Sequence, residues 1–197
     1  MKNYTKKTIE FYNQYIEKYI KNGAVVLEDK INRFINFIPG SKVLDVACGP
    51  GHDTDYLTKK GFDCLGIDLS EKMIKFAKKH YQGKFRVMDF FDLDFKEGSF
   101  DGIWCSSAFV HISKSDLSGL LKNFKKLLKR NGILGIVTPG GQKRIKRKED
   151  SRIFTMFDKK ELEEYLKSVN FKIVESRIFS FKRMKWLFIL SKVSQLR

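Results

Sequence analysis

Between residues 42 and 138, short apolar segments alternate with longer segments of helical periodicity. The short segments have the length and the β-branched content of buried strands, whereas the longer ones repeat apolar residues every three or four positions. This pattern predicts strands at residues 42–47, 63–67, 84–88, 102–105 and 132–138, and helices at 54–60, 70–80 and 116–130. Such alternation is typical of a parallel sheet with helices on both faces.

The last part of the chain has a different pattern. Residues 159–168 have helical periodicity, and two apolar segments follow at 171–181 and 184–192, separated by the basic turn Lys182-Arg183. Consecutive strands joined by a tight turn form a hairpin, so one of them must run antiparallel to the sheet. We therefore expect an α/β fold with a seven-stranded, mostly parallel sheet, helices on both faces and an antiparallel C-terminal hairpin.

Two further helical segments precede the first strand. Apolar and aromatic residues recur at helical spacing across residues 5–21 and again from 27 to 38, where Pro39-Gly40 ends the pattern. No internal repeat or linker-like stretch separates these segments from the predicted sheet. We expect a single domain over residues 1–197, with N-terminal helices in 1–38 and the α/β core in 39–197.

The net charge of +16 raises the question of a nucleic-acid partner. Nine of the 39 basic residues are arginines, and the lysines are spread over every segment of the chain. Because side chains that read phosphates and bases bidentately are usually arginines, the lysine excess indicates overall composition more than a nucleic-acid surface. RNA stays open as a partner on charge alone.

The spacing of the cysteines and the hydropathy of the chain indicate a cellular compartment. Cys48, Cys64 and Cys105 lie far apart and form no C-x-x-C pair, which predicts a reducing compartment and neither a disulfide nor a zinc site. No apolar run approaches the roughly 18–20 residues of a membrane span, and the polar N-terminal residues lack the apolar core of a signal peptide. We expect a cytoplasmic protein with no membrane partner and no metal.

The first predicted strand ends in V-L-D-V-A-C-G-P-G, in which one acid, Asp45, precedes a run of small residues. Ligands of open parallel sheets bind beyond the carboxyl ends of the strands, and small residues let a ligand approach the backbone closely. The next helix turns its unpaired N–H groups toward the same space. An acid here suits a ligand with positive charge, and the absence of a G-K-[ST] loop argues against a nucleoside triphosphate.

A second acid follows the next predicted strand. Asp68 stands in G-I-D-L-S, 17 residues after Gly51, the last glycine of the turn. An acid in this place accepts hydrogen bonds from the hydroxyls of a ribose. The alternative is structural, because either Asp68 or Ser70 could cap the helix that follows.

The motif series V-L-D-V-A-C-G-P-G, G-I-D-L-S, F-R-V-M-D-F, S-F-D-G-I-W and L-L-K-R-N-G-I-L resembles the class I S-adenosylmethionine-dependent methyltransferases. Order and spacing agree from Pro39 to Val137, and Ala47 stands where many members have glycine. The resemblance implies a Rossmann-like fold, S-adenosylmethionine as the methyl donor, and helices in residues 1–38 that cover the donor site.

The resemblance also assigns residues to the donor. Asp45 would bind its amino group directly or through water, Asp68 its ribose, and Asp89 the N6 amine of its adenine. Further residues would line its methionine portion with backbone, contact its adenine, or lie beneath its sulfonium: Ala47, Gly49 and Gly51; Leu69, Met73 and Phe90; Cys105 and Ser106. For Met73 and Phe90 the alternative is an ordinary place in the hydrophobic core.

Two flanking segments resemble parts of the family that enclose the site. Tyr12 and Tyr19, in F-Y-N-Q-Y-I-E-K-Y, resemble an N-terminal tyrosine helix that folds over the donor. Arg152 and Phe154, in R-I-F-T-M-F, resemble an Arg-aromatic segment near the acceptor, where Arg152 would pair with a carboxylate or phosphate. The alternatives are core positions for the tyrosines and a surface position for Arg152.

His111, in F-V-H-I, is the candidate catalytic residue. As a general base it would accept a proton from the acceptor as the methyl group arrives. The alternative is a structural histidine that ties its loop to the next helix. The basic run at residues 143–148 is more typical of a solvated loop than of a polyanion contact.

The function predicted on these grounds is methyl transfer from S-adenosylmethionine to an O, N or S atom of a small-molecule acceptor. A tRNA or rRNA methyltransferase is the alternative that the net charge favours. A binding module that holds the donor without turnover is a third possibility.

Overall fold

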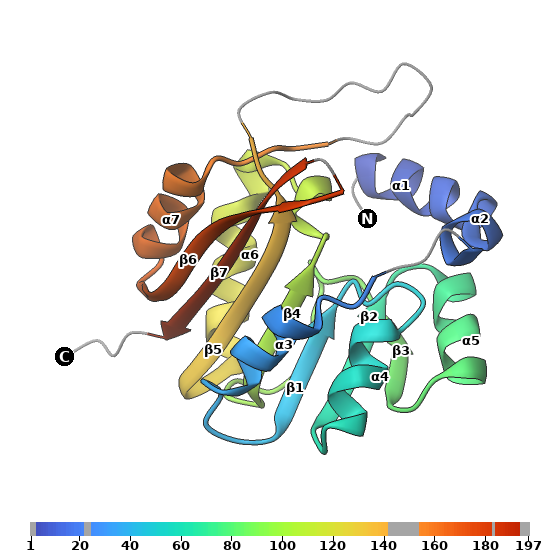
Figure 1. Cartoon of the computed structure of the whole chain (residues 1–197), viewed down its shortest axis with the longest axis horizontal. Helices are drawn as coiled ribbons and strands as arrows, with labels where there is room; N and C mark the ends of the chain where they lie inside the picture. The colour runs from blue at the N-terminus through green and yellow to red at the C-terminus, as the bar shows by residue number, and fades with distance from the viewer. Residues whose placement is uncertain (1–2, 22–24, 142–153, 183, 194–197) are drawn as a thin grey trace.

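The computed structural model describes residues 3–21, 25–141, 154–182 and 184–193 (Figure 1). Its strands form one seven-stranded sheet in the order β3-β2-β1-β4-β5-β7-β6. All neighbouring pairs from β3 to β5 are parallel, whereas β7 runs antiparallel to both β5 and β6. The strands are β1 Lys42–Val46, β2 Asp63–Asp68, β3 Lys84–Val87, β4 Phe100–Ser106, β5 Leu128–Pro139, β6 Phe171–Phe181 and β7 Met184–Val193.

The helices lie on both faces of the sheet, as the alternating pattern predicts (Figure 1). The predicted fold class is therefore confirmed, with β7 as the antiparallel strand of the final hairpin. The helices are α1 Asn3–Gln14, α2 Ile16–Lys21, α3 Glu28–Ile35, α4 His52–Lys59, α5 Glu71–His80, η1 Phe109–His111, α6 Lys114–Leu127 and α7 Lys159–Ser168.

Several boundaries differ from the sequence-based ones. The helix predicted to reach residue 130 ends at Leu127, because Leu128 already pairs with Phe100 of β4. The ladder between β4 and β5 then shifts its register before Gly102 pairs with Ile133. The N-terminal helical segment is divided in two, α1 and α2, at Tyr15.

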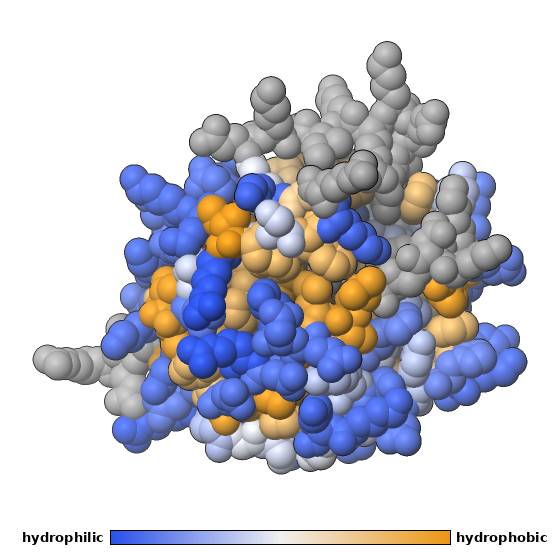
Figure 2. All heavy atoms as spheres, in the orientation of Figure 1, coloured by the Kyte–Doolittle hydropathy of each residue, from blue (hydrophilic) through white to orange (hydrophobic). Residues whose placement is uncertain are grey.

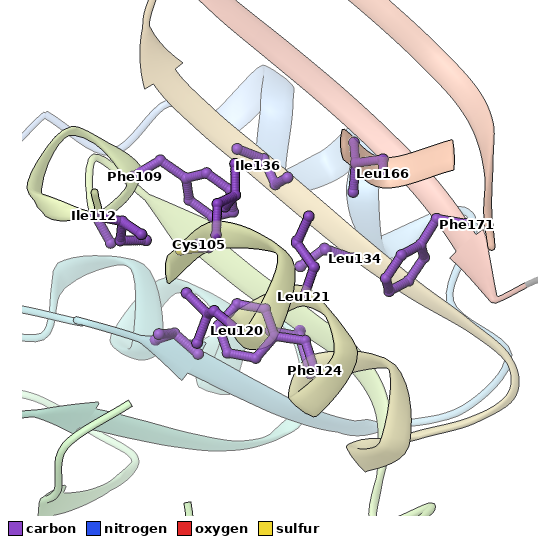
Figure 3. Close-up of a cluster of buried hydrophobic side chains, with 14 of the residues drawn as sticks. Cys105, Phe109, Ile112, Leu120, Leu121, Phe124, Leu134, Ile136, Leu166 and Phe171 are labelled. Atoms are coloured by element: carbon purple, nitrogen blue, oxygen red, sulfur yellow. The ribbon is translucent and has the colours of Figure 1, made fainter. Parts of the chain in front are cut away.

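One face of the sheet packs against α6 and α7. Leu120, Leu121 and Phe124 repeat along α6 at helical spacing and turn toward the sheet (Figure 3). They belong to the same buried cluster as Leu134 and Ile136 of β5. Burial of this apolar stripe stabilises α6 on the sheet. It thereby also fixes the position of the segment that precedes α6, which contains η1.

The opposite face carries α3, which packs directly onto the sheet backbone through Phe34. A Cβ atom on Gly102 of β4 would lie 2.6 Å from the Phe34 ring, and one on Gly135 of β5 would lie 2.8 Å from it. The glycines therefore provide the space that the ring fills. Phe34 also contacts Trp104 of β4, with ring centroids 5.2 Å apart.

The surface on this face is covered mostly by hydrophilic residues, and apolar side chains gather over β5, β6 and β7 beside α3 (Figure 2). Partly buried Val174, Phe179 and Trp186 pack against the α3 cluster here. Within the described residues, no helix is long and apolar enough to cross a membrane.

The packing of Phe34 gives a stability prediction. We expect Phe34→Ala to lower the free energy of unfolding by about 3–5 kcal/mol, because it removes a fully buried ring and leaves a cavity against Trp104. Urea unfolding followed by circular dichroism measures this change. Ile178→Ala is the control, since Ile178 is 55% exposed and its truncation should change stability by less than about 0.5 kcal/mol. Equal losses in the two variants would contradict this packing.

Candidate functional site

The turn between β1 and α4 has the backbone conformation that its small residues predict. Ala47, Gly49 and Gly51 all have positive φ, at 55°, 55° and 96°. A Cβ atom on Gly51 would lie 2.7 Å from the Phe85 ring, so glycine is required there. A Cβ atom on Gly49 would meet no atom within 4 Å. The turn is therefore tight on the protein side and open at Gly49, where a ligand can approach the backbone.

Asp68, at the end of β2, holds this turn. Its Oδ2 accepts a hydrogen bond from the Gly49 N–H at 3.0 Å, and its Oδ1 accepts one from the Ser70 N–H at 2.8 Å. The capping residue of α5 is Ser70, whose hydroxyl accepts from the Met73 N–H at 3.2 Å. Asp68 therefore orders the edge of the site, and its contact with a ribose stays a prediction.

Asp45, at the end of β1, lies beneath the turn. It is 1% exposed, and its Oδ2 accepts a hydrogen bond from the Thr54 hydroxyl at 2.6 Å. A third acid, Asp53, belongs to the first turn of α4 and accepts a hydrogen bond from the Trp104 indole N–H at 2.8 Å. Asp53 is not among the residues predicted from the sequence, because its partner Trp104 lies on a strand far along the chain.

The pKa values of all three acids are raised. Burial raises the pKa of Asp45 well above its ordinary value, and the charges of Asp53 and Asp68 raise it further. Burial raises the pKa of Asp53 to about 6 and that of Asp68 above its ordinary value. In the part of the chain that the structure describes, no lysine or arginine forms an ion pair with any of them. The site is suited to a cationic ligand.

The remaining predicted donor contacts lie at the same edge of the sheet. Asp89 follows β3, and its Oδ1 accepts from the Phe91 N–H at 2.9 Å, while Phe90 stacks at a tilt on Phe91 with centroids 4.7 Å apart. Ser106, which ends β4, and Leu69 are half-buried. Their contacts with a donor stay predictions.

Two predicted donor contacts have side chains inside the core. Met73 is 2% exposed on the buried face of α5. The Cys105 side chain lies with Phe109 in the cluster beneath α6 (Figure 3). For Met73 the structure fits the core alternative.

A second group of predicted residues is brought together by three separate segments. The Tyr12 hydroxyl of α1 and His111 Nε2 of η1 are hydrogen-bonded at 3.0 Å, and their ring centroids are 5.7 Å apart. The Phe154 ring lies 5.4 Å from that of His111. The Thr155 N–H donates to the Val110 carbonyl at 2.7 Å, which fixes the Phe154 segment beside η1.

Asn13, the neighbouring residue of α1, contacts the start of α5. The Asn13 Oδ1 accepts a hydrogen bond from the Ser70 hydroxyl at 2.6 Å, and its carbonyl accepts one from Lys72 at 3.0 Å. Residues 12 and 13 thus connect η1 to the start of α5, and α1 lies beyond the carboxyl ends of the strands (Figure 1). That the N-terminal helices cover a bound donor stays a prediction.

Some predicted site residues lie outside this description. Arg152 and the basic run at 143–148 are outside the described residues, and nothing is described of the Tyr19 side chain on α2. Over the described ranges, no three His, Cys, Asp or Glu side chains are grouped as metal ligands.

The raised pKa of Asp53 gives a pH prediction. Because its folded pKa of about 6 lies above its unfolded value, the contribution of Asp53 to stability is fully present below roughly pH 4 and is lost as pH rises through 6. We expect Asp53→Asn to raise the midpoint of thermal unfolding at pH 7.5 and to raise it much less at pH 4.5. Asp63→Asn is the control, since that acid is exposed and paired with Lys84. A midpoint change that is the same at both pH values would contradict the assignment.

Comparisons with known proteins extend the resemblance. A family model described as a methyltransferase domain matches residues 43–132. Phosphoethanolamine N-methyltransferase 3 of Arabidopsis thaliana is 33% identical over 122 residues, which are 59% of this chain and 24% of that protein. The phosphoethanolamine N-methyltransferase of Plasmodium falciparum is 28% identical over 189 residues, which are 90% of this chain and 71% of that protein. The chain spans about a quarter of the length of the Arabidopsis relative.

A solved structure supports the fold over nearly the whole chain. It is the 1,6-didemethyltoxoflavin N1-methyltransferase of Burkholderia thailandensis, with bound 1,6-didemethyltoxoflavin and S-adenosylhomocysteine. The two share 18% identity with a TM-score of 0.81, over 97% of this chain and 88% of the other. The motif order and the strand order agree with those of the class I S-adenosylmethionine-dependent methyltransferases, and residues 43–132 match the methyltransferase domain model.

Proposed function

We propose that this chain transfers the methyl group of S-adenosylmethionine to an O, N or S atom of a small-molecule acceptor. The observation that carries the proposal is the 3.0 Å hydrogen bond between Tyr12 and His111. The adjacent Asn13 accepts a hydrogen bond from Ser70, which caps α5 and lies two residues after Asp68, the predicted ribose ligand. We infer that the pair of Tyr12 and His111 supplies a group able to take a proton near the place where the methyl group would be presented.

The donor would lie along the carboxyl ends of β3, β2, β1 and β4. Asp89 would receive its adenine amine, Asp68 its ribose, and the backbone of Ala47, Gly49 and Gly51 its methionine portion. The open space at Gly49 and the acids without an ion pair support this orientation. S-adenosylhomocysteine bound to the Burkholderia neighbour supports the same class of ligand.

The reaction is an in-line displacement. A lone pair of the acceptor attacks the methyl carbon, the carbon–sulfur bond breaks, and its electron pair stays on sulfur to leave S-adenosylhomocysteine. The donor supplies the electrophile, so the chain aligns acceptor and methyl group and excludes water. His111 would take the proton that an oxygen, nitrogen or thiol acceptor loses. Tyr12 and Phe154 would enclose the acceptor beside it.

A small acceptor agrees with the relatives. The Arabidopsis and Plasmodium proteins are phosphoethanolamine N-methyltransferases, and the Burkholderia enzyme holds 1,6-didemethyltoxoflavin. Phosphoethanolamine is therefore the first acceptor to test on this chain. The cytoplasmic location expected from the sequence stays a prediction, and the three cysteines are free in the structure.

RNA is the second candidate acceptor, favoured by the net charge of +16. Lysines are dense on α5, where Lys72, Lys75, Lys78 and Lys79 occupy one ten-residue helix. An RNA methyltransferase would lose RNA affinity steeply as the salt concentration rises. A chain that binds no RNA at moderate salt would exclude this candidate.

The ribose assignment predicts the effect of Asp68→Ala. We expect this change to weaken binding of S-adenosylhomocysteine at least about 100-fold, because it removes charge-assisted hydrogen bonds to the ribose and the support of Gly49. Isothermal titration calorimetry measures the affinity. Asp63→Ala is the matched control, since Asp63 lies at the other end of the same strand. Affinity unchanged by Asp68→Ala would refute the assignment.

The base assignment predicts the effect of His111→Ala. We expect turnover to fall about 100-fold or more, with donor affinity within about threefold of the wild type. His80→Ala is the control, because His80 is an exposed residue at the end of α5. Tyr12→Phe should give an intermediate loss, since the ring stays and the hydroxyl is removed. Turnover retained by His111→Ala would return His111 to a structural role.

A further inference from the structure

Asp53 differs from Asp45 and Asp68 in the group that holds its carboxylate. Its Oδ2 accepts the Trp104 indole N–H at 2.8 Å. Trp104 is fully buried on β4 and packed against Phe34, so its indole is a rigid support. Among the described residues, Trp104 is the hydrogen-bond partner of this carboxylate, which keeps lone pairs for further donors.

Asp53 is also more accessible than Asp45. Asp53 is half-buried at the start of α4, whereas Asp45 is 1% exposed and its Oδ2 is taken by the Thr54 hydroxyl. Asp45 and Trp104 are register partners on β1 and β4. Asp45 is close enough to Asp53 for their charges to interact, and it adds negative potential to the site. Asp53 is the more accessible of the two to a ligand.

The strand order tells which part of the donor lies near Asp53. The strands run β2-β1-β4, with Asp68 at the end of β2 and Trp104 on β4. A donor with its ribose on Asp68 therefore extends over β1 toward β4 with its methionine portion. This portion carries two cations, the sulfonium and the α-ammonium group. The ammonium has three N–H donors, whereas the sulfonium has none for a carboxylate to accept.

We propose that Asp53 binds the α-ammonium group of the methyl donor, and that Trp104 acts as the positioning residue that aims its carboxylate. This inference rests on the proposed function and deepens it, because it moves the direct contact from the expected Asp45 to Asp53. The raised pKa of the free Asp53 carboxyl agrees with a group that lacks its positive partner.

The test is calorimetric titration of the full chain with three ligands. S-adenosylmethionine carries both cations, S-adenosylhomocysteine carries the ammonium alone, and 5′-methylthioadenosine has the nucleoside without the amino acid. We expect Asp53→Asn to weaken binding of the first two by about 10-fold to 100-fold and to leave the third within twofold. Trp104→Phe should give the same pattern with a smaller loss.

Asp55→Asn is the matched control on the same helix. Its carboxylate is engaged elsewhere, by Lys59 at 2.7 Å and by the Gln82 N–H at 2.9 Å. It changes the charge of α4 by the same amount, so we expect affinities within twofold for all three ligands. Thermal unfolding of each variant checks that it is folded. If Trp104→Phe does not fold, Asp53→Asn still tests the proposal.

Three outcomes would overturn the inference. Unchanged binding of all ligands to Asp53→Asn would remove its contact with the donor. A loss confined to S-adenosylmethionine would assign Asp53 to the sulfonium. An equal loss for 5′-methylthioadenosine would make its effect structural. Failure of the wild-type chain to bind S-adenosylmethionine would instead contradict the proposed function itself.

Discussion

The burial of three carboxylates at one edge of the sheet is the constraint on which the site depends. Removing charged groups from water costs free energy, and hydrogen bonds from Thr54, Trp104 and the backbone offset part of that cost. The remainder is reflected in raised pKa values for Asp45, Asp53 and Asp68. A cation bound among them would stabilise their ionised forms, which is why a donor with two positive centres fits this edge.

The packing of α3 on the sheet supports this arrangement. Gly102 and Gly135 leave space for the Phe34 ring, and Phe34 packs against Trp104. Trp104 in turn fixes the Asp53 carboxylate. The packing of α3 is thus connected to the Asp53 carboxylate through the side chains of Phe34 and Trp104. From α1, Tyr12 contacts His111 and Asn13 contacts Ser70.

The sequence predicted the fold and one side of the site well, because both depend on local patterns. Alternating apolar segments determine the sheet, and the acids at strand ends locate Asp45 and Asp68. The bond between Asp53 and Trp104 joins residues 51 positions apart, and that between Tyr12 and His111 joins residues 99 apart. Neither follows from spacing along the chain. Trp104 and Cys105 face opposite sides of the sheet and are both buried, because helices cover both faces.

Transfer of a methyl group from S-adenosylmethionine to a small acceptor is the proposed activity of this chain. The most direct measurement is incubation with S-adenosylmethionine labelled in its methyl group, a panel of small acceptors that includes phosphoethanolamine, and RNA, followed by separation of small molecules from RNA. We predict label in a small-molecule product, equal amounts of S-adenosylhomocysteine, and loss of both with His111→Ala. Label in RNA alone, or donor binding without any transfer across the panel, would contradict the account.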